Sequence, residues 1–163
     1  MSVNAPATWG PGDRAALLAF ERYFSWADTI RTHFEKRRPG YSDERKAHWE
    51  PYMAYWYGGL FAVTEGWEEL AFKDPEIDQL LNQKDNVEIL RRYRNGAFHF
   101  QRSYFDPRFV DLWERDEVIV WAWRLHRHLE RWIKHDLPKI LETTFIPEGP
   151  GNTEHEGRPC KDG

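Results

Sequence analysis

Apolar residues recur at steps of three and four along much of this 163-residue chain, which is the spacing of one face of an α-helix. The first such stretch runs from Asp13 to Arg37 and ends in a cationic turn followed by proline and glycine. Its apolar positions are Leu17, Phe20, Phe24, Ala27, Ile30 and Phe34. The pattern predicts a long amphipathic helix over this range.

A second helix is predicted to begin near Ser42 or near Pro51 and to contain "YMAYWYGGLFAVTEGWEELAF". Its Gly58–Gly59 pair lowers helix stability by about 1 kcal/mol per glycine relative to alanine. We therefore expect another helix to pack closely against these glycines. The tyrosines and tryptophans of this segment are expected to serve packing, because aromatic residues at helical spacing are usually buried.

Capping signals predict two short helices, since Asp74 and Asp106 each precede a proline and can act as N-caps. Between them, a helix is predicted from Asp85 or Asn86 to residue 104. A long last helix is predicted through Val118, Trp121, Leu125, Leu129, Trp132 and Ile133, and Pro138 is expected to end or bend it.

No segment shows the alternation of a strand and no repeat is present, so the predicted fold class is all-α. We expect a single helical bundle of four or five main helices over residues 13–146. Residues 1–12 are expected to be a flexible N-terminus. Residues 147–163 are rich in Gly, Pro and charge, and are expected to be a disordered tail.

Composition favours a soluble, cytoplasmic protein. The single cysteine, Cys160, has no partner for a disulfide, and no stretch resembles a signal peptide or a membrane span. The net charge of −4 argues against indiscriminate nucleic-acid binding. Charge is unevenly distributed, however: residues 65–81 carry six acidic side chains and one lysine, whereas residues 84–108 carry six basic and three acidic ones.

The basic segment centres on "RRYRNGAFHF", residues 91–100. On a helical wheel its core face would consist of Leu90, Tyr93, Ala97, Phe100 and Tyr104. The opposite arc would carry Arg91, Arg94, Asn95, Phe98, His99 and Arg102.

Two side chains on this arc, Asn95 and His99, are i,i+4 neighbours and are expected to touch. Arg94 and His99 would diverge by about 140° and lie roughly 7.5 Å apart along the axis. One helix therefore does not bring both side chains to a single phosphate. A second copy related by a twofold axis would bring the Arg of each copy opposite the His of the other.

The run Arg94-Asn95-Gly96-Ala97-Phe98-His99 resembles the R-N-x-x-x-H form of the signature of the HEPN (higher eukaryotes and prokaryotes nucleotide-binding) superfamily. The resemblance implies a helical homodimer with both motifs in a shared cleft. It also implies a metal-independent endoribonuclease of the toxin or defence type, which needs no cofactor and which a protein antitoxin could neutralise. Gln101 departs from the tyrosine of members that a nucleotidyltransferase antitoxin modifies, so that kind of antitoxin is not expected.

Under this resemblance Arg94 and His99 are the expected catalytic pair, with Asn95 as the supporting polar residue. Imidazole exchanges protons near neutral pH, and guanidinium keeps its charge and can meet two phosphate oxygens. Arg91, Phe98 and Arg102 share the arc and are expected to bind RNA, although burial of Phe98 at the dimer interface is favoured over base stacking.

Two other interpretations of the polar arc stay open. The same basic cleft would suit a non-catalytic dimer that binds RNA, a nucleotide or a protein. The arc could also be a solvated face of a helical interaction protein. A metal site is not expected, because no two histidines have i,i+4 spacing, and His128 is predicted to be a hydrogen-bonded core residue near the apolar stripe of the last helix.

Overall fold

The computed structural model describes residues 13–37 and 46–144, and within these ranges every regular element is a helix. The all-α prediction is confirmed. The four long helices are α1 (Asp13–Arg37), α2 (Lys46–Glu69), α4 (Lys84–Phe98) and α6 (Asp116–His135). The three short ones are α3 (Pro75–Leu81), α5 (Pro107–Trp113) and α7 (Leu137–Thr143). The predicted flexible N-terminus and disordered tail lie outside the described residues.

Most predicted helix ends agree with the structure. The Asp74 side chain accepts hydrogen bonds from the backbone N–H groups of Glu76 and Ile77, and the Asp106 side chain accepts one from Arg108, so both predicted caps are confirmed. Helix α6 ends at His135, and α7 begins at Leu137, one residue before Pro138, so the predicted interruption near this proline is confirmed. The second helix begins at Lys46, between the two predicted starts, and Pro51 lies inside it.

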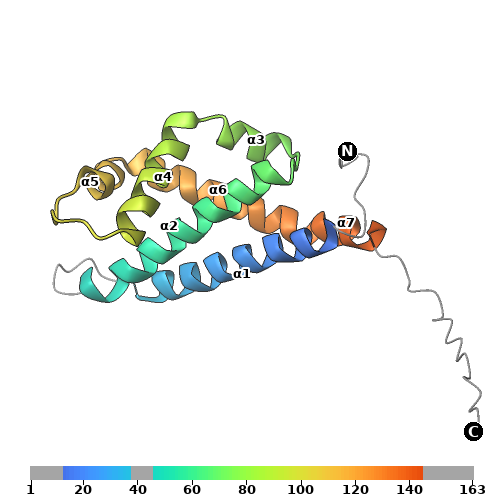
Figure 1. Ribbon diagram of the computed structural model, residues 1–163, viewed down its shortest axis with the longest axis horizontal. Coiled ribbons are helices and arrows are strands. Elements are labelled where there is room, and N and C mark those ends of the chain that lie inside the picture. The colour runs from blue at the N-terminus through green and yellow to red at the C-terminus, as the bar shows by residue number, and fades with distance from the viewer. Residues whose placement is uncertain (1–12, 38–45, 145–163) are drawn as a thin grey trace, which may run out of the picture.

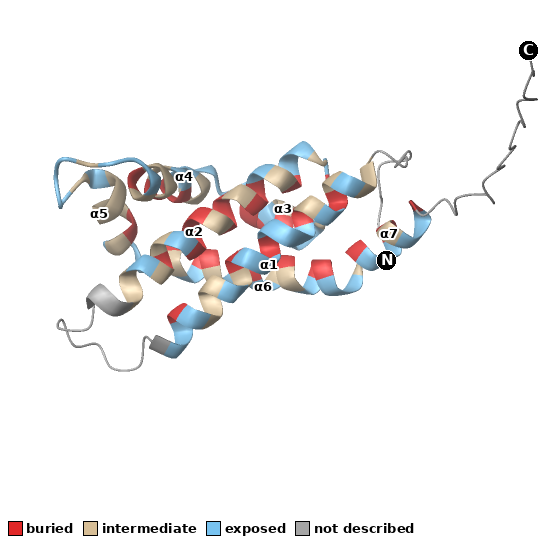
Figure 2. Cartoon of the chain, turned by 60° about the horizontal axis from the view of Figure 1, so that its bottom comes forward, coloured by how far each residue is buried: buried red, intermediate tan, exposed pale blue. Residues whose placement is uncertain are grey.

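Helices α1 and α2 run antiparallel, side by side, and α4 packs on the other side of α2 (Figure 1). α3 packs against α6, and α5 contacts both α4 and α6. α7 returns to the start of α1, where the Arg14 guanidinium donates to the Leu141 carbonyl oxygen at 2.9 Å. Buried residues form a stripe along each long helix that faces this common interior (Figure 2).

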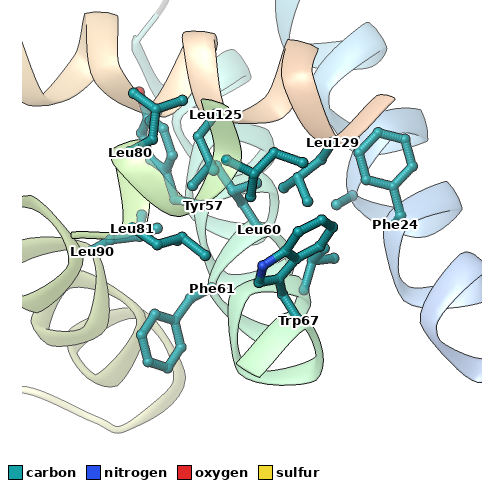
Figure 3. Close-up of a cluster of buried hydrophobic side chains, with 14 of the residues drawn as sticks. Phe24, Tyr57, Leu60, Phe61, Trp67, Leu80, Leu81, Leu90, Leu125 and Leu129 are labelled. Carbon is teal, nitrogen blue, oxygen red and sulfur yellow. The ribbon is translucent and has the colours of Figure 1, made fainter. Parts of the chain in front are cut away.

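The core is rich in aromatic and leucine side chains. Leucines of α3, α4 and α6 lie with Leu60 and Trp67 of α2 in one cluster (Figure 3). The indole N–H of Trp67 donates to Asp78 at 3.0 Å, and that of Trp121 donates to the Leu80 carbonyl oxygen at 3.0 Å. These hydrogen bonds fix α3 to α2 and α6, since each satisfies a polar group within apolar surroundings.

The close approach of α1 and α2 depends on Gly59. A Cβ at this position would lie 3.1 Å from the Ala27 Cβ and 3.4 Å from the Ala27 Cα. The expectation that another helix packs closely against this glycine is therefore confirmed. The absence of a side chain allows the two helix backbones to approach each other.

The histidine in the core is His126, whereas His128 is partly exposed and pairs with Glu76 at 3.0 Å, so the prediction for His128 is wrong. The buried arc of α6 is wide and includes His126, whereas His128 lies at its edge. His126 accepts a hydrogen bond at Nδ1 from the Trp56 indole N–H (3.3 Å), and its Nε2 lies 3.0 Å from Asp28 Oδ1. The ring thus links α6 to both α1 and α2.

Candidate functional site

Helix α4 ends at Phe98, six residues before its predicted end at residue 104. His99 has an extended backbone (φ −124°, ψ 132°), and its N–H donates to the Asn95 carbonyl oxygen at 3.2 Å. The prediction that Phe100 and Tyr104 belong to the core is therefore wrong, because their side chains are 93% and 72% exposed.

The early end of α4 follows from the packing of α5. Asp106 is restricted to an extended conformation by Pro107 and starts α5, which folds back against α4. Gly96 permits this contact, since a Cβ there would lie 3.1 Å from the Arg108 Cβ and 3.2 Å from the Phe109 ring. The chain needs the residues from 99 to 106 to reverse its direction (Figure 2).

Arg94 points toward α2. Its Nη2 lies 3.1 Å from Glu65 Oε2, its Nη1 donates to Asn95 Oδ1 at 3.0 Å, and its guanidinium lies 5.2 Å from the centroid of the Phe61 ring. Sequence reasoning missed Glu65, since 29 residues separate the two partners and no local pattern links them. These contacts hold the cation at the seam between α2 and α4.

Asn95 and His99 do not form the expected side-chain contact. The Asn95 amide oxygen is occupied by Arg94, and only the backbone carbonyl of Asn95 contacts His99. No hydrogen bond or ion pair joins the exposed His99 imidazole to another side chain in the described ranges. The Gln101 side chain instead donates to the His99 carbonyl oxygen, which shapes the turn after the helix.

Phe98 lies across α2 and is 49% exposed. Its ring covers Gly58, where a Cβ would come within 2.2 Å of the ring, and its edge meets Tyr55 with centroids 5.4 Å apart. Tyr55 is itself 59% exposed. The two rings form an aromatic surface pair that joins α2 and α4 near His99.

The other cations of α4 and of the turn after it differ in their surroundings. Arg91 forms two hydrogen bonds with the Glu88 carboxylate, at 2.7 and 2.6 Å, which raises the pKa of Arg91 and lowers the pKa of Glu88. Arg92 pairs with Asp111 and so ties α4 to α5. Arg102 is exposed in the turn after α4 and is outside the predicted helical arc, because the helix has already ended.

His99 lines a pocket of about 400 Å³ between the end of α4, the start of α2, and α5. The wall also includes Glu50, Ala97, Tyr104, Phe109 and Trp113. Arg94 is not part of this wall. Within the chain the structure brings Arg94 and Asn95 together and places His99 at the pocket. No described contact joins the Arg94 and His99 side chains.

In residues 13–37 and 46–144 no three His, Cys, Asp or Glu side chains cluster in a way that could hold a metal ion. No helix in the described part of the chain has both the length and the apolar character to cross a membrane.

No protein-family model matches this chain, and no curated protein or solved structure matches it.

Proposed function

We propose that this protein is a HEPN-like, metal-independent endoribonuclease that acts as a homodimer. The observation that carries the proposal is the exposed imidazole of His99, which borders a pocket one residue after α4 ends, with a fixed guanidinium, Arg94, slightly more than one turn earlier. A proton-transfer group and a permanent cation are the two kinds of group that RNA cleavage by the ribose hydroxyl requires.

The reaction uses the 2′-hydroxyl of RNA as its nucleophile. One His99 accepts the 2′-hydroxyl proton while the 2′ oxygen bonds to the adjacent phosphorus. The bond from phosphorus to the 5′ oxygen breaks, and the second His99 of the dimer donates a proton to that oxygen. The products are a 2′,3′-cyclic phosphate and a 5′-hydroxyl end.

Arg94 stabilises the negative charge that grows on the phosphate oxygens. Guanidinium has five N–H donors, so the contacts with Glu65 and Asn95 leave others for phosphate. Asn95 is a positioning residue for Arg94 under this arrangement. Because Arg94 turns toward α2 and His99 borders the pocket, a second copy of the chain is needed to bring an Arg94 to each His99.

Cleavage of an RNA in the presence of EDTA, followed by analysis of the new ends, tests the proposal. The unmodified protein is expected to release cyclic-phosphate ends, and His99→Ala to reduce the rate by at least about 100-fold. His135→Ala is the matched control, since His135 is exposed at the end of α6. Activity that EDTA abolishes, or that survives in His99→Ala, would contradict the mechanism.

The second candidate is a non-catalytic dimer that binds RNA through the same surface. The ion pair between Arg94 and Glu65 favours it, because the pair holds the guanidinium at the seam between α2 and α4, away from the pocket that His99 lines. The same assay separates the two, since the binder would retain RNA without producing cyclic-phosphate ends.

A further inference from the structure

The pocket beside His99 continues into a second hollow under α4. The second hollow has a volume of about 270 Å³ and shares Glu50, Ala97 and Phe109 with the first. Tyr93 forms its inner wall. Together the two hollows make a groove between the start of α2, the last turns of α4, and α5, of a size usual for small-molecule sites.

The walls of this groove include six Phe, Tyr and Trp side chains. The Phe109 and Trp113 rings are stacked, with centroids 6.0 Å apart and an interplanar angle of 22°, and the Tyr93 ring meets Phe109 edge-on at 5.6 Å. The Tyr104 ring stands exposed at the rim. Flat aromatic walls suit a flat aromatic ligand, and stacking of one base on such a ring typically contributes about 1–3 kcal/mol.

Glu50 supplies the only carboxylate among the described residues that line the groove. No hydrogen bond or ion pair joins it to another side chain in the described ranges. The charge of Glu50 acts inside the groove. The pKa of Tyr93 is raised first by burial and then by the neighbouring Tyr57 and Glu50. An ionised carboxylate only accepts hydrogen bonds and repels phosphate, so the groove suits a ligand group that has N–H donors and no negative charge.

We propose that this groove binds one unpaired base of the RNA and prefers guanine. Guanine has two adjacent donors, N1–H and the N2 amino group, on the edge that pairs with cytosine, and the two oxygens of Glu50 can accept both. Adenine and cytosine place an acceptor nitrogen next to their amino group, and uracil has one N–H between two carbonyl groups. The assignment rests on the proposed function, because it puts the base next to a phosphate at His99.

Calorimetric titration with guanosine, adenosine, cytidine and uridine monophosphates tests the groove directly. Guanosine monophosphate is expected to bind about ten- to a hundred-fold more tightly than the others, as for other two-point base contacts. Glu50→Gln is expected to remove this preference, and Tyr104→Ala, at an exposed position, to weaken binding of all four. Glu142→Gln on α7 is the matched control, because Glu142 is exposed and far from the groove in sequence.

Equal affinity for the four nucleotides, or a guanine preference that Glu50→Gln leaves intact, would overturn the base-site proposal. The nuclease proposal is read out separately by RNA cleavage, which the His99→Ala variant is expected to lose while it keeps the preference for guanine. Selective guanine binding without RNA cleavage would reject the nuclease and leave the base site standing. RNA cleavage without any base preference would reject the base site and leave the nuclease proposal standing.

Discussion

The His126 imidazole lies between polar groups of two other helices. Its Nδ1 accepts from the Trp56 indole N–H, and its Nε2 lies 3.0 Å from both Asp28 Oδ1 and Arg31 Nε. Arg31 donates to the same Asp28 oxygen at 2.7 Å, so a guanidinium stands beside the ring. Burial lowers the pKa of His126, and the nearby Arg31 charge lowers it further, while the hydrogen bond to Asp28 opposes both.

The depressed pKa of His126 makes stability depend on pH. Below about pH 6.5, the ordinary value for histidine, the unfolded chain binds a proton that the folded protein resists. The contribution of His126 is therefore complete above that pH and is lost as the pH falls below it. We predict that the urea midpoint of the unmodified protein decreases between about pH 7 and about pH 5.5.

The variant His126→Leu separates this effect from that of other groups. It removes the acceptor for the buried Trp56 N–H, which should cost about 1–3 kcal/mol near pH 7. Its urea midpoint should then change less between about pH 7 and about pH 5.5 than that of the unmodified protein. An equal or steeper decrease in the variant would contradict the assignment of the pH dependence to His126.

At the scale of single elements, we predict from the α1–α2 contact that Gly59→Ala lowers stability, although helix propensity alone would predict an increase. Gly59→Ala adds a residue that favours helix by about 1 kcal/mol, but its Cβ meets the Ala27 Cβ and backbone. Overpacking of this kind costs about 1–3 kcal/mol, so the net effect should be destabilising. Thermal or urea unfolding measures the result.

Gly58→Ala is the matched comparison for Gly59→Ala. Its Cβ meets only the end of the half-exposed Phe98 ring, which can rotate away. We therefore expect Gly58→Ala to be the more stable of the two variants. If Gly59→Ala proves as stable as Gly58→Ala, then α1 and α2 do not approach each other as closely as described.

The elements also show what the sequence could and could not predict. α1 and the Asp74 and Asp106 caps were predictable, because periodicity and capping are local. The end of α4 was not, since the spacing of Phe100 and Tyr104 fits a helix and only the return of α5 onto Gly96 prevents it. Similarly, the motif residues could be identified from the sequence. The partner of Arg94 on α2 could not be predicted, because this ion pair joins segments that are distant in the sequence.

At the scale of the whole molecule, the proposed activity requires two chains. The Tyr55–Phe98 pair exposes apolar rings on the side of α4 that carries Arg94, and a stable interface buries about 800 Å² on each partner. We predict that light scattering gives twice the chain mass of 19.6 kDa. The homodimer is expected to form through this surface.

Phe98→Glu should convert the dimer to a monomer, because it places a charge in an apolar contact. Val120→Glu is the matched control, since Val120 is also about half-exposed but lies on α6. A dimer that persists in Phe98→Glu would place the interface elsewhere and would remove the shared site.

The most direct test of a catalytic site shared between two chains is a titration of RNA cleavage. A fixed amount of unmodified protein is co-refolded with increasing amounts of the Arg94→Ala/His99→Ala double variant, and the cleavage rate in EDTA is measured. An excess of the double variant should abolish activity, because a mixed dimer has no site with both groups, whereas an excess of Arg127→Ala/His135→Ala, which keeps Arg94 and His99, should not lower the rate. A rate that is unaffected by excess double variant, or no cleavage by the unmodified protein, would contradict the account.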